Sequence, residues 1–293
     1  MASLETVALD QERWGLTANR LKNNESMARS LVSGLSIAGA ILAVLAVQIR
    51  TSHPAASEVV GYAGAVALTL VLVVRAQALR RGRVQAWVLA AAASQSLQSE
   101  MCLYRTSSGP YGDHFGGNPE ATLLERRDEI LEKVRSIQKY AVEPDPKTVV
   151  LLGPMDADAY ISERVNPAIS ENRRFGDYIV EEQRFWQKAE YILVIVGALL
   201  AAALTFTHNL ASGAWVAVIT TMCVAVGADT QAERFAELTV SYRAMPDRLT
   251  NIVSRWRTNH GTVNQLVEQV EAMLLQEYHA WVAGADEYWK DAA

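Results

Sequence analysis

The chain has 293 residues, of which half are hydrophobic and a fifth are charged, and its formal net charge is −5. A length of this size fits one large domain or two ordinary ones. The negative charge argues against nucleic acid as a partner, because neutralising phosphates requires clustered lysine and arginine. The two cysteines, Cys102 and Cys223, lie in a charged segment and in an apolar run, so a disulfide framework is not expected.

Two apolar runs with a short break between them come first in the chain. Residues 30–49 read SLVSGLSIAGAILAVLAVQI and residues 59–74 read VVGYAGAVALTLVLVV, with the helix-breaking Pro54 in between. The first run has the length of a membrane span and lacks the polar face that a helix of a soluble core keeps. The runs therefore predict a hairpin of two transmembrane helices. Small residues at four-residue steps predict where the helices approach each other closely: Ser30, Gly34 and Ala38 in the first run, Gly61 and Ala65 in the second.

A basic segment, RAQALRRGR, follows the second run. Because it lies at the end of a predicted span, its arginines are interpreted as anchors for lipid headgroups: Arg75, Arg80, Arg81 and Arg83. The alternative is a solvated helix face.

The rest of the first half predicts polar helices that pack on a partner helix. After a break at 103–109 (LYRTSSG), apolar residues recur at spacings near seven, which is typical of packing within the subunit or between subunits. A linker rich in proline follows at 143–159. The apolar positions of the stripe are Leu123, Ile130, Val134, Ile137 and Ala141.

The second half repeats this plan. Residues 191–207 read YILVIVGALLAAALTFT, and residues 214–228 read AWVAVITTMCVAVGA after a six-residue loop. A similar break at 255–261 (RWRTNHG) precedes another apolar stripe that begins at Val263. The sequence thus predicts a parallel repeat of two units, 1–142 and 160–293, joined by the linker 143–159.

Basic residues orient the predicted spans. They lie before the first run and after the second run of each hairpin, whereas the two short loops hold only Arg50. By the positive-inside rule, both termini and the middle segment lie in the cytoplasm. The flanking residues, besides the four arginines named above, are Arg13, Arg20, Lys22, Arg29, Arg173, Arg174, Arg184, Lys188, Arg234 and Arg243.

The fourth run supplies the polar groups that a channel would need. Thr220 and Thr221 lie within it, and Asp229 and Glu233 follow at its cytoplasmic end. The two acids are four residues apart and share a helix face, so they could form a cation-attracting ring in an oligomer. Alternatively, they pair with nearby bases on a solvated helix end. Glu58 is the candidate for the outer mouth.

The sequence contains no pattern that predicts catalysis or a cofactor. The five histidines fall in separate segments without metal-ligand spacing, and the glycine-rich FGGNPE lacks the Lys-Ser/Thr of a phosphate loop. We therefore expect neither an enzyme nor a bound metal.

Three segments carry a resemblance to the SLATT family, the SMODS- and SLOG-associating two-transmembrane effectors. They are YISERVNPAISENRRFGDYIVEEQRFWQKAEYILVIVG, the tail QLVEQVEAMLLQEYHAWV and, for another subtype, ERWGLTANRLKNNESMARSLVSG. The residues that resemble the family are Arg164, Gln183, Trp186, Lys188, Ala189, Glu277 and Trp281. The resemblance implies a bacterial conflict or immunity effector that sits in the inner membrane and forms pores when a nucleotide-linked sensor fires.

The resulting prediction is an all-α membrane protein with four spans arranged as two hairpins and long cytoplasmic helical extensions. It binds lipid, forms a homo-oligomer, responds to a nucleotide-signalling or sensor partner, and acts as a pore or disrupts the bacterial inner membrane. The alternative is a scaffold or anchor that recruits a soluble partner to its cytoplasmic helices.

Overall fold

A computed structural model describes residues 2–50, 52–78, 81–112, 116–146, 153–207 and 232–276. These residues are helical or irregular and include no strand, which agrees with the predicted all-α class. The chain divides into two compact units. Unit 1 comprises Met1–Asn24, Arg81–Arg173 and Ala244–Ala293, and unit 2 comprises Glu25–Arg80 and Arg174–Arg243. Each unit is thus drawn from both halves of the sequence.

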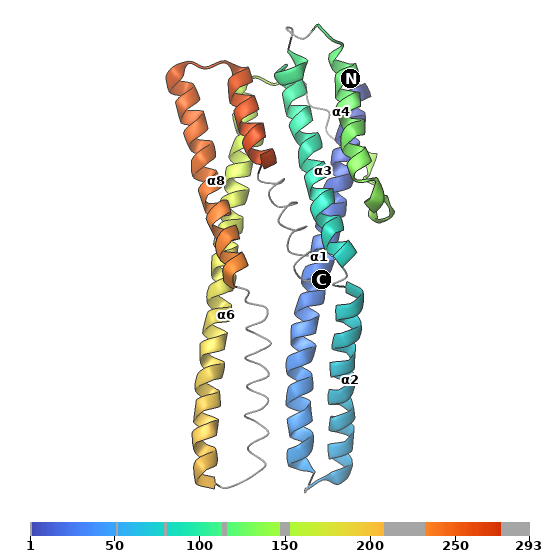
Figure 1. Ribbon diagram of the computed structural model, residues 1–293, viewed down its shortest axis with the longest axis vertical. Coiled ribbons are helices and arrows are strands. Elements are labelled where there is room, and N and C mark those ends of the chain that lie inside the picture. The colour runs from blue at the N-terminus through green and yellow to red at the C-terminus, as the bar shows by residue number, and fades with distance from the viewer. Residues whose placement is uncertain are drawn as a thin grey trace. The chain divides into compact units, whose positions relative to one another are not determined.

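Unit 2 contains the hairpin that the first two apolar runs predicted (Figure 1). Helix α1 spans Ala2–Ile49 and helix α2 spans Pro54–Ala78, so the break falls where Pro54 was expected to place it. Pro54 takes the first position of α2, where its missing N–H costs no hydrogen bond. At 1.5 Å per residue the 48 residues of α1 extend about 70 Å, far beyond the thickness of a hydrocarbon core. Its residues up to Asn24 belong to unit 1, and those from Glu25 belong to unit 2.

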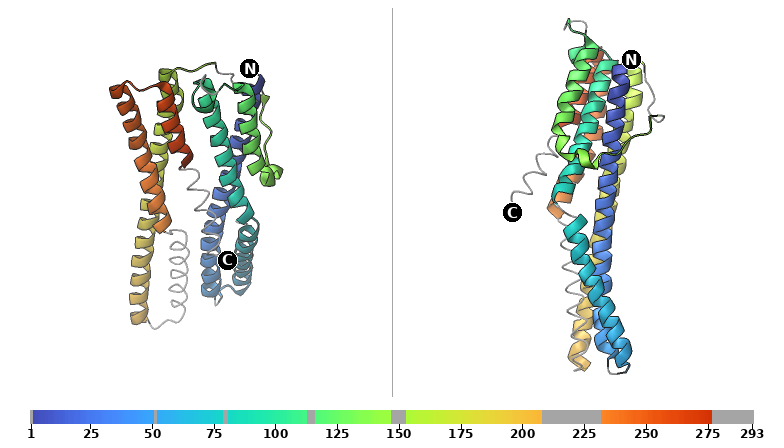
Figure 2. Two further views of the ribbon diagram at one scale, coloured as in Figure 1. Left: turned by 45° about the horizontal axis from the view of Figure 1, so that its top comes forward. Right: turned by 90° about the vertical axis from the view of Figure 1, so that its right-hand side faces the viewer.

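Unit 1 has a first core around helix α3, Arg81–Arg105 (Figure 2). The N-terminal part of α1, helix α4 (Pro119–Lys133) and the 3-10 helix η3 (Arg135–Tyr140) surround it, and a short 3-10 turn η1 (Gly109–Tyr111) joins α3 to α4. The predicted stripe of the first half lies here, since Leu123, Ile130, Val134 and Ile137 are all buried in this core.

A second core in unit 1 uses the other side of α3 and the second half of the chain. Its helices are α5 (Ala157–Tyr160), the π-helix η5 (Ile161–Val165), the first turns of α6 (Asn166–Thr207), α8 (Ala232–Asn259) and a helical segment over 263–276. The stripe of the second half is buried in it through Leu266, Val267, Val270 and Leu274. Both stripes therefore pack within the subunit as far as they are described.

The two breaks that look alike in sequence also fold alike. After α3, the Ser108 N–H donates to the Leu103 carbonyl and Ser107 has a left-handed φ of 51°. After α8, the Gly261 N–H donates to the Trp256 carbonyl and His260 has a φ of 50°. Both are the six-to-one bond and left-handed residue that end a helix in a Schellman motif.

The segment over 263–276 begins with a capping box. The Thr262 N–H donates to the Gln265 side-chain oxygen, and the Gln265 N–H donates to the Thr262 hydroxyl, each at 3.3 Å. These reciprocal bonds satisfy two backbone donors at the start of a helix, and the spacing T-x-x-Q is their sequence signature.

Candidate functional site

The hairpin of unit 2 exposes its apolar side chains. The most apolar windows of α1 and α2 have mean hydropathies of 2.3 and 1.9, and only 17% of each window is buried. A core helix of a soluble protein would bury most of these side chains, whereas lipid can cover them. The arrangement therefore indicates membrane association. The exposed residues on the two helices include Leu31, Leu45, Val47, Val59, Tyr62, Val66, Leu68, Leu70, Leu72 and Val73.

The two helices meet at a pair of glycines. A Cβ built on Gly64 would lie 3.2 Å from the Ala43 nitrogen and from the Gly39 oxygen. A Cβ on Gly39 would lie 2.8 Å from Leu68 Cγ. Near the loop, the buried Ser57 hydroxyl donates to the Ala46 carbonyl at 2.7 Å. Helices can approach this closely in lipid because small residues leave room for backbone contact.

The small residues predicted for α1 do not make this contact in the described hairpin. Ser30, Gly34 and Ala38 are exposed, and a Cβ on Gly34 would meet no atom of the described residues within 4 Å. In α2, Ala65 is exposed, and Gly61 is 3.6 Å from Ala46, which is ordinary contact. Small residues occur on more than one face of α1, and the face that packs is the one on which Gly39 lies opposite Gly64.

The third apolar run forms the C-terminal part of α6, and its described side chains are largely exposed: Tyr191, Ile192, Val194, Ile195 and Leu199. The fourth run, 214–228, lies outside the described residues. Two helices of the described chain, α1 and α2, are long and apolar enough to cross a membrane. An arrangement with four spans remains a prediction.

The predicted pore residues fall mostly outside the described part of the chain. This applies to Thr220, Thr221 and Asp229. Glu233 lies in the first turn of α8, where the backbone alone is described, and Glu58 is exposed in the first turns of α2. The ring of Asp229 and Glu233 remains a prediction.

The predicted anchor arginines lie around the junction of α2 and α3. Arg75 lies in the last turn of α2, and Arg81 and Arg83 lie in the first turn of α3. Arg83 is exposed, and Arg80 lies outside the described residues. This position at the end of an apolar helix suits an anchor, which remains a prediction.

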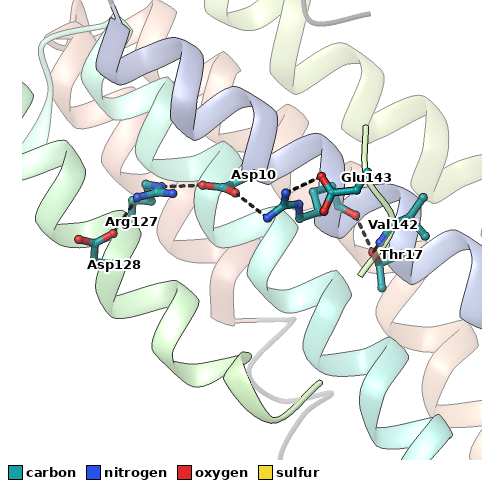
Figure 3. Close-up of polar contacts among 7 residues, drawn as sticks. Asp10, Thr17, Arg127, Asp128, Val142 and Glu143 are labelled. Atoms are coloured by element: carbon teal, nitrogen blue, oxygen red, sulfur yellow. Dashed lines mark hydrogen bonds and ion pairs between the residues drawn. The ribbon is translucent and has the colours of Figure 1, made fainter. Parts of the chain in front are cut away.

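A series of ion pairs and hydrogen bonds joins the start of the predicted linker to α1 (Figure 3). Asp10 accepts from Arg127 Nε at 2.6 Å and lies 3.7 Å from Arg13, which pairs with Glu143 at 2.7 Å. The fully buried Thr17 accepts a hydrogen bond from the N–H of Val142 at 2.9 Å. These contacts join α1, α4 and the residues after η3, so they position the polypeptide where the first half ends.

A second cluster is buried inside unit 1. Arg164 donates from Nε and Nη2 to the two carboxylate oxygens of Glu271, each at 3.0 Å. Tyr160 donates its hydroxyl to the same carboxylate at 2.8 Å, and Gln95 on α3 accepts from both Nη atoms of Arg164 at 3.4 Å. Glu271 is 1% exposed and Arg164 is 7% exposed. We name Gln95, Tyr160, Arg164 and Glu271 the buried charge cluster.

Local backbone features position this cluster. Asp156 caps α5 by accepting from the Ala159 N–H at 2.8 Å. The π-helix η5 then supplies Arg164, and such turns often mark functional positions in helical proteins. Sequence reasoning quoted Arg164 only for a resemblance and missed its pairing with Glu271. The signal was a glutamate inside an apolar stripe, between Val270 and Leu274.

Burial governs the protonation of the cluster. Burial lowers the pKa of Arg164, but the adjacent Glu271 carboxylate outweighs this, so the net shift is upward and the guanidinium stays charged. Burial, reinforced by Glu271, raises the pKa of the Tyr160 hydroxyl, which therefore stays protonated as a donor. Burial likewise raises the pKa of the neighbouring Cys102 thiol to about 12. A thiol held neutral is a poor nucleophile at physiological pH. Among the described residues, no group of three or more His, Cys, Asp or Glu could hold a metal ion.

Two family models match the chain. Residues 160–281 match SMODS and SLOG-associating 2TM effector domain 1 (SLATT_1), and residues 12–115 match a protein family of unknown function, DUF4231. No curated protein and no solved structure matches the chain. The first match describes an effector domain of conflict and immunity systems rather than an enzyme.

Proposed function

Since this chain is a SLATT-family protein with a two-transmembrane effector domain at residues 160–281, we propose that it forms an oligomeric pore or disrupts the membrane when triggered. The observation that carries the proposal is the exposed apolar surface of the α1–α2 hairpin, which needs lipid or other transmembrane helices to cover it. Catalysis is not part of the proposed function.

A pore of this kind requires several subunits. Four spans in one subunit leave too little room for a water path among close-packed helices. The described parts of both apolar stripes are buried in the subunit's own cores, so the subunits would meet through other surfaces. We assign the polar path to the fourth run, with Thr220 and Thr221 within it and Asp229 and Glu233 at its cytoplasmic mouth.

The proposed location is the bacterial inner membrane, with several passes and with both termini and unit 1 in the cytoplasm. Support comes from the basic flanks of both hairpins and from the polar character of unit 1. Arg75, Arg80, Arg81 and Arg83 would hold anionic headgroups at the end of α2. A nucleotide-signalling or sensor protein would bind unit 1 and supply the trigger.

Ion flux through liposomes that contain the purified full chain tests the proposal. The expected result is a cation-selective flux that Asp229→Asn with Glu233→Gln reduces, because the variant removes the charge of the ring without changing its size. Arg126→Gln, which removes an exposed ion pair of α4 with Glu129, serves as the control and should conduct normally. A reconstituted oligomer that never conducts, while unit 1 retains a soluble partner, would instead identify a membrane scaffold. A chain that is strictly monomeric in detergent would exclude the oligomeric pore.

A further inference from the structure

The buried charge cluster lies where the two halves of the sequence meet within unit 1. Arg164, Glu271 and Tyr160 come from the segment that matches the effector domain, and Gln95 comes from α3 in the first half. Cys102 lies seven residues after Gln95, on the same face of α3, and packs in the second core. The effector segment 160–281 therefore does not enclose its own ion pair but needs α3 to cover it.

Further contacts join the same surfaces. At the end of α3 the Arg105 guanidinium donates to the Gly153 carbonyl at 2.9 Å and pairs with Glu163 at 3.0 Å. The Ser108 hydroxyl lies within the first break and is fully buried, and it donates at 2.9 Å to the side-chain oxygen of Asn264, which follows the second break. The contact between the halves is thus specific along the last turns of α3.

An ion pair in this position is not explained by stability alone. Removing a guanidinium and a carboxylate from water costs several kcal/mol per ion, and well-packed apolar residues in place of a buried pair are often as stable or more stable. The pair adds selectivity for one partner helix, because the buried N–H groups of Arg164 need acceptors that the partner must supply. Glu271 accepts hydrogen bonds from Nε and Nη2 of Arg164, and the Gln95 oxygen accepts one from each Nη atom.

The chain has a competing arrangement that such selectivity would prevent. The two halves are built on the same plan, and proteins with repeated units misassemble by exchanging like elements between copies. Two effector segments from different chains could press their apolar stripes together. Purely apolar surfaces would not distinguish that pairing from the correct one. A buried N–H donor that lacks an acceptor disfavours the wrong pairing.

We propose that the buried charge cluster is a pairing determinant: the surface formed by Tyr160, Arg164 and Glu271 selects α3 of the chain's own first half, through the Gln95 acceptor, over a second copy of itself. Gln95 is the positioning residue, because its side-chain oxygen accepts the hydrogen bonds of Arg164 when α3 is the partner. The proposal concerns how the halves pair and does not depend on what the assembled effector does to the membrane.

The test uses the full chain with a protease site inserted within residues 147–152, an affinity tag at the N-terminus and a second tag at the C-terminus. The chain is folded, purified in detergent and then cleaved. The cleaved protein is bound through its N-terminal tag and mixed with an excess of untagged cleaved chain. The amount of tagged second half that stays bound is measured over time. For the parent protein we expect retention over the whole exchange period. Gln95→Leu leaves two buried N–H groups without an acceptor, and we expect the halves to separate at least tenfold faster. Gln138→Leu, at an exposed position of η3, is the matched control and should behave as the parent.

A second variant separates selectivity from stability. Gln95→Leu, Tyr160→Phe, Arg164→Met and Glu271→Leu together replace the cluster by apolar side chains of similar size. We expect this variant to unfold no more easily than the parent, yet to allow differently tagged second halves to capture each other after cleavage. Equal retention in Gln95→Leu and the parent would overturn the proposal. So would an apolar variant whose second halves still capture none of each other.

Discussion

The contact between Gly39 and Gly64 gives a quantitative prediction for the membrane hairpin. Substituting Gly64→Ala places a methyl group 3.2 Å from two backbone atoms of α1 and 3.3 Å from Leu42 Cβ. Backbone atoms cannot rotate away as a side chain can, so the helices must move apart by a few tenths of an ångström. Overpacking of this kind costs about 1–3 kcal/mol, and the higher helix propensity of alanine returns about 1 kcal/mol. The net expectation is a loss of about 0–2 kcal/mol.

Gly34→Ala is the matched control within the same hairpin. It offers the same gain in helix propensity, and its new methyl group meets no atom within 4 Å in the part of the chain that the structure describes. We therefore expect it to stabilise the protein by up to about 1 kcal/mol, so the two variants should differ by about 1–3 kcal/mol.

This difference in stability is measured by denaturing each purified variant in detergent and monitoring the loss of helix by circular dichroism. Gly64→Val should be less stable than Gly64→Ala, because its branched side chain extends further toward α1. Equal stability of Gly64→Ala and Gly34→Ala would refute the assigned packing face. A destabilised Gly34→Ala would instead favour the face predicted from the sequence.

Three further predictions address the lipid-facing surface, the second core and the second break. Val66→Asp on the exposed face of α2 should lower membrane insertion by about 3 kcal/mol if that face meets lipid, whereas Val66→Ala should insert normally, as measured by membrane fractionation. Raising the pH from 9 toward 12 should destabilise the fold, because the Cys102 pKa of about 12 keeps the thiol protonated in the folded chain while the unfolded thiol ionises near 9. The native state then binds more protons, so the free energy of unfolding falls by up to about 1.4 kcal/mol per pH unit, and Cys102→Ala should make the decline shallower in pH-dependent urea unfolding. Thr262→Ala should cost about 1 kcal/mol by removing the cap of the 263–276 helix, visible as faster amide exchange there, and Thr258→Ala, at an exposed position of α8, should not change that exchange.

The sequence alone determined the features that depend on local chemistry. Apolar runs without a polar face predicted the hairpin of α1 and α2, and Pro54 fixed the position of the break, because a proline is excluded from a helix interior but accepted at its first position. The similar breaks and stripes predicted a repeated plan in the polar regions. Two of the three segments that carry the SLATT resemblance overlap the matched effector domain for the same reason, since they are local patterns of spans and flanking residues, and the third lies within the match to the family of unknown function.

Only the tertiary structure decided which faces meet. Small residues occur on several faces of α1, and nothing in their spacing distinguished the Gly34 face from the Gly39 face that packs against α2. The stripes left open whether they pack within or between subunits, and the structure buries their described residues within unit 1. The pairing of Arg164 with Glu271 joins residues more than a hundred positions apart. No local pattern encodes such a contact, because it depends on how α3 and the second half are brought together by folding.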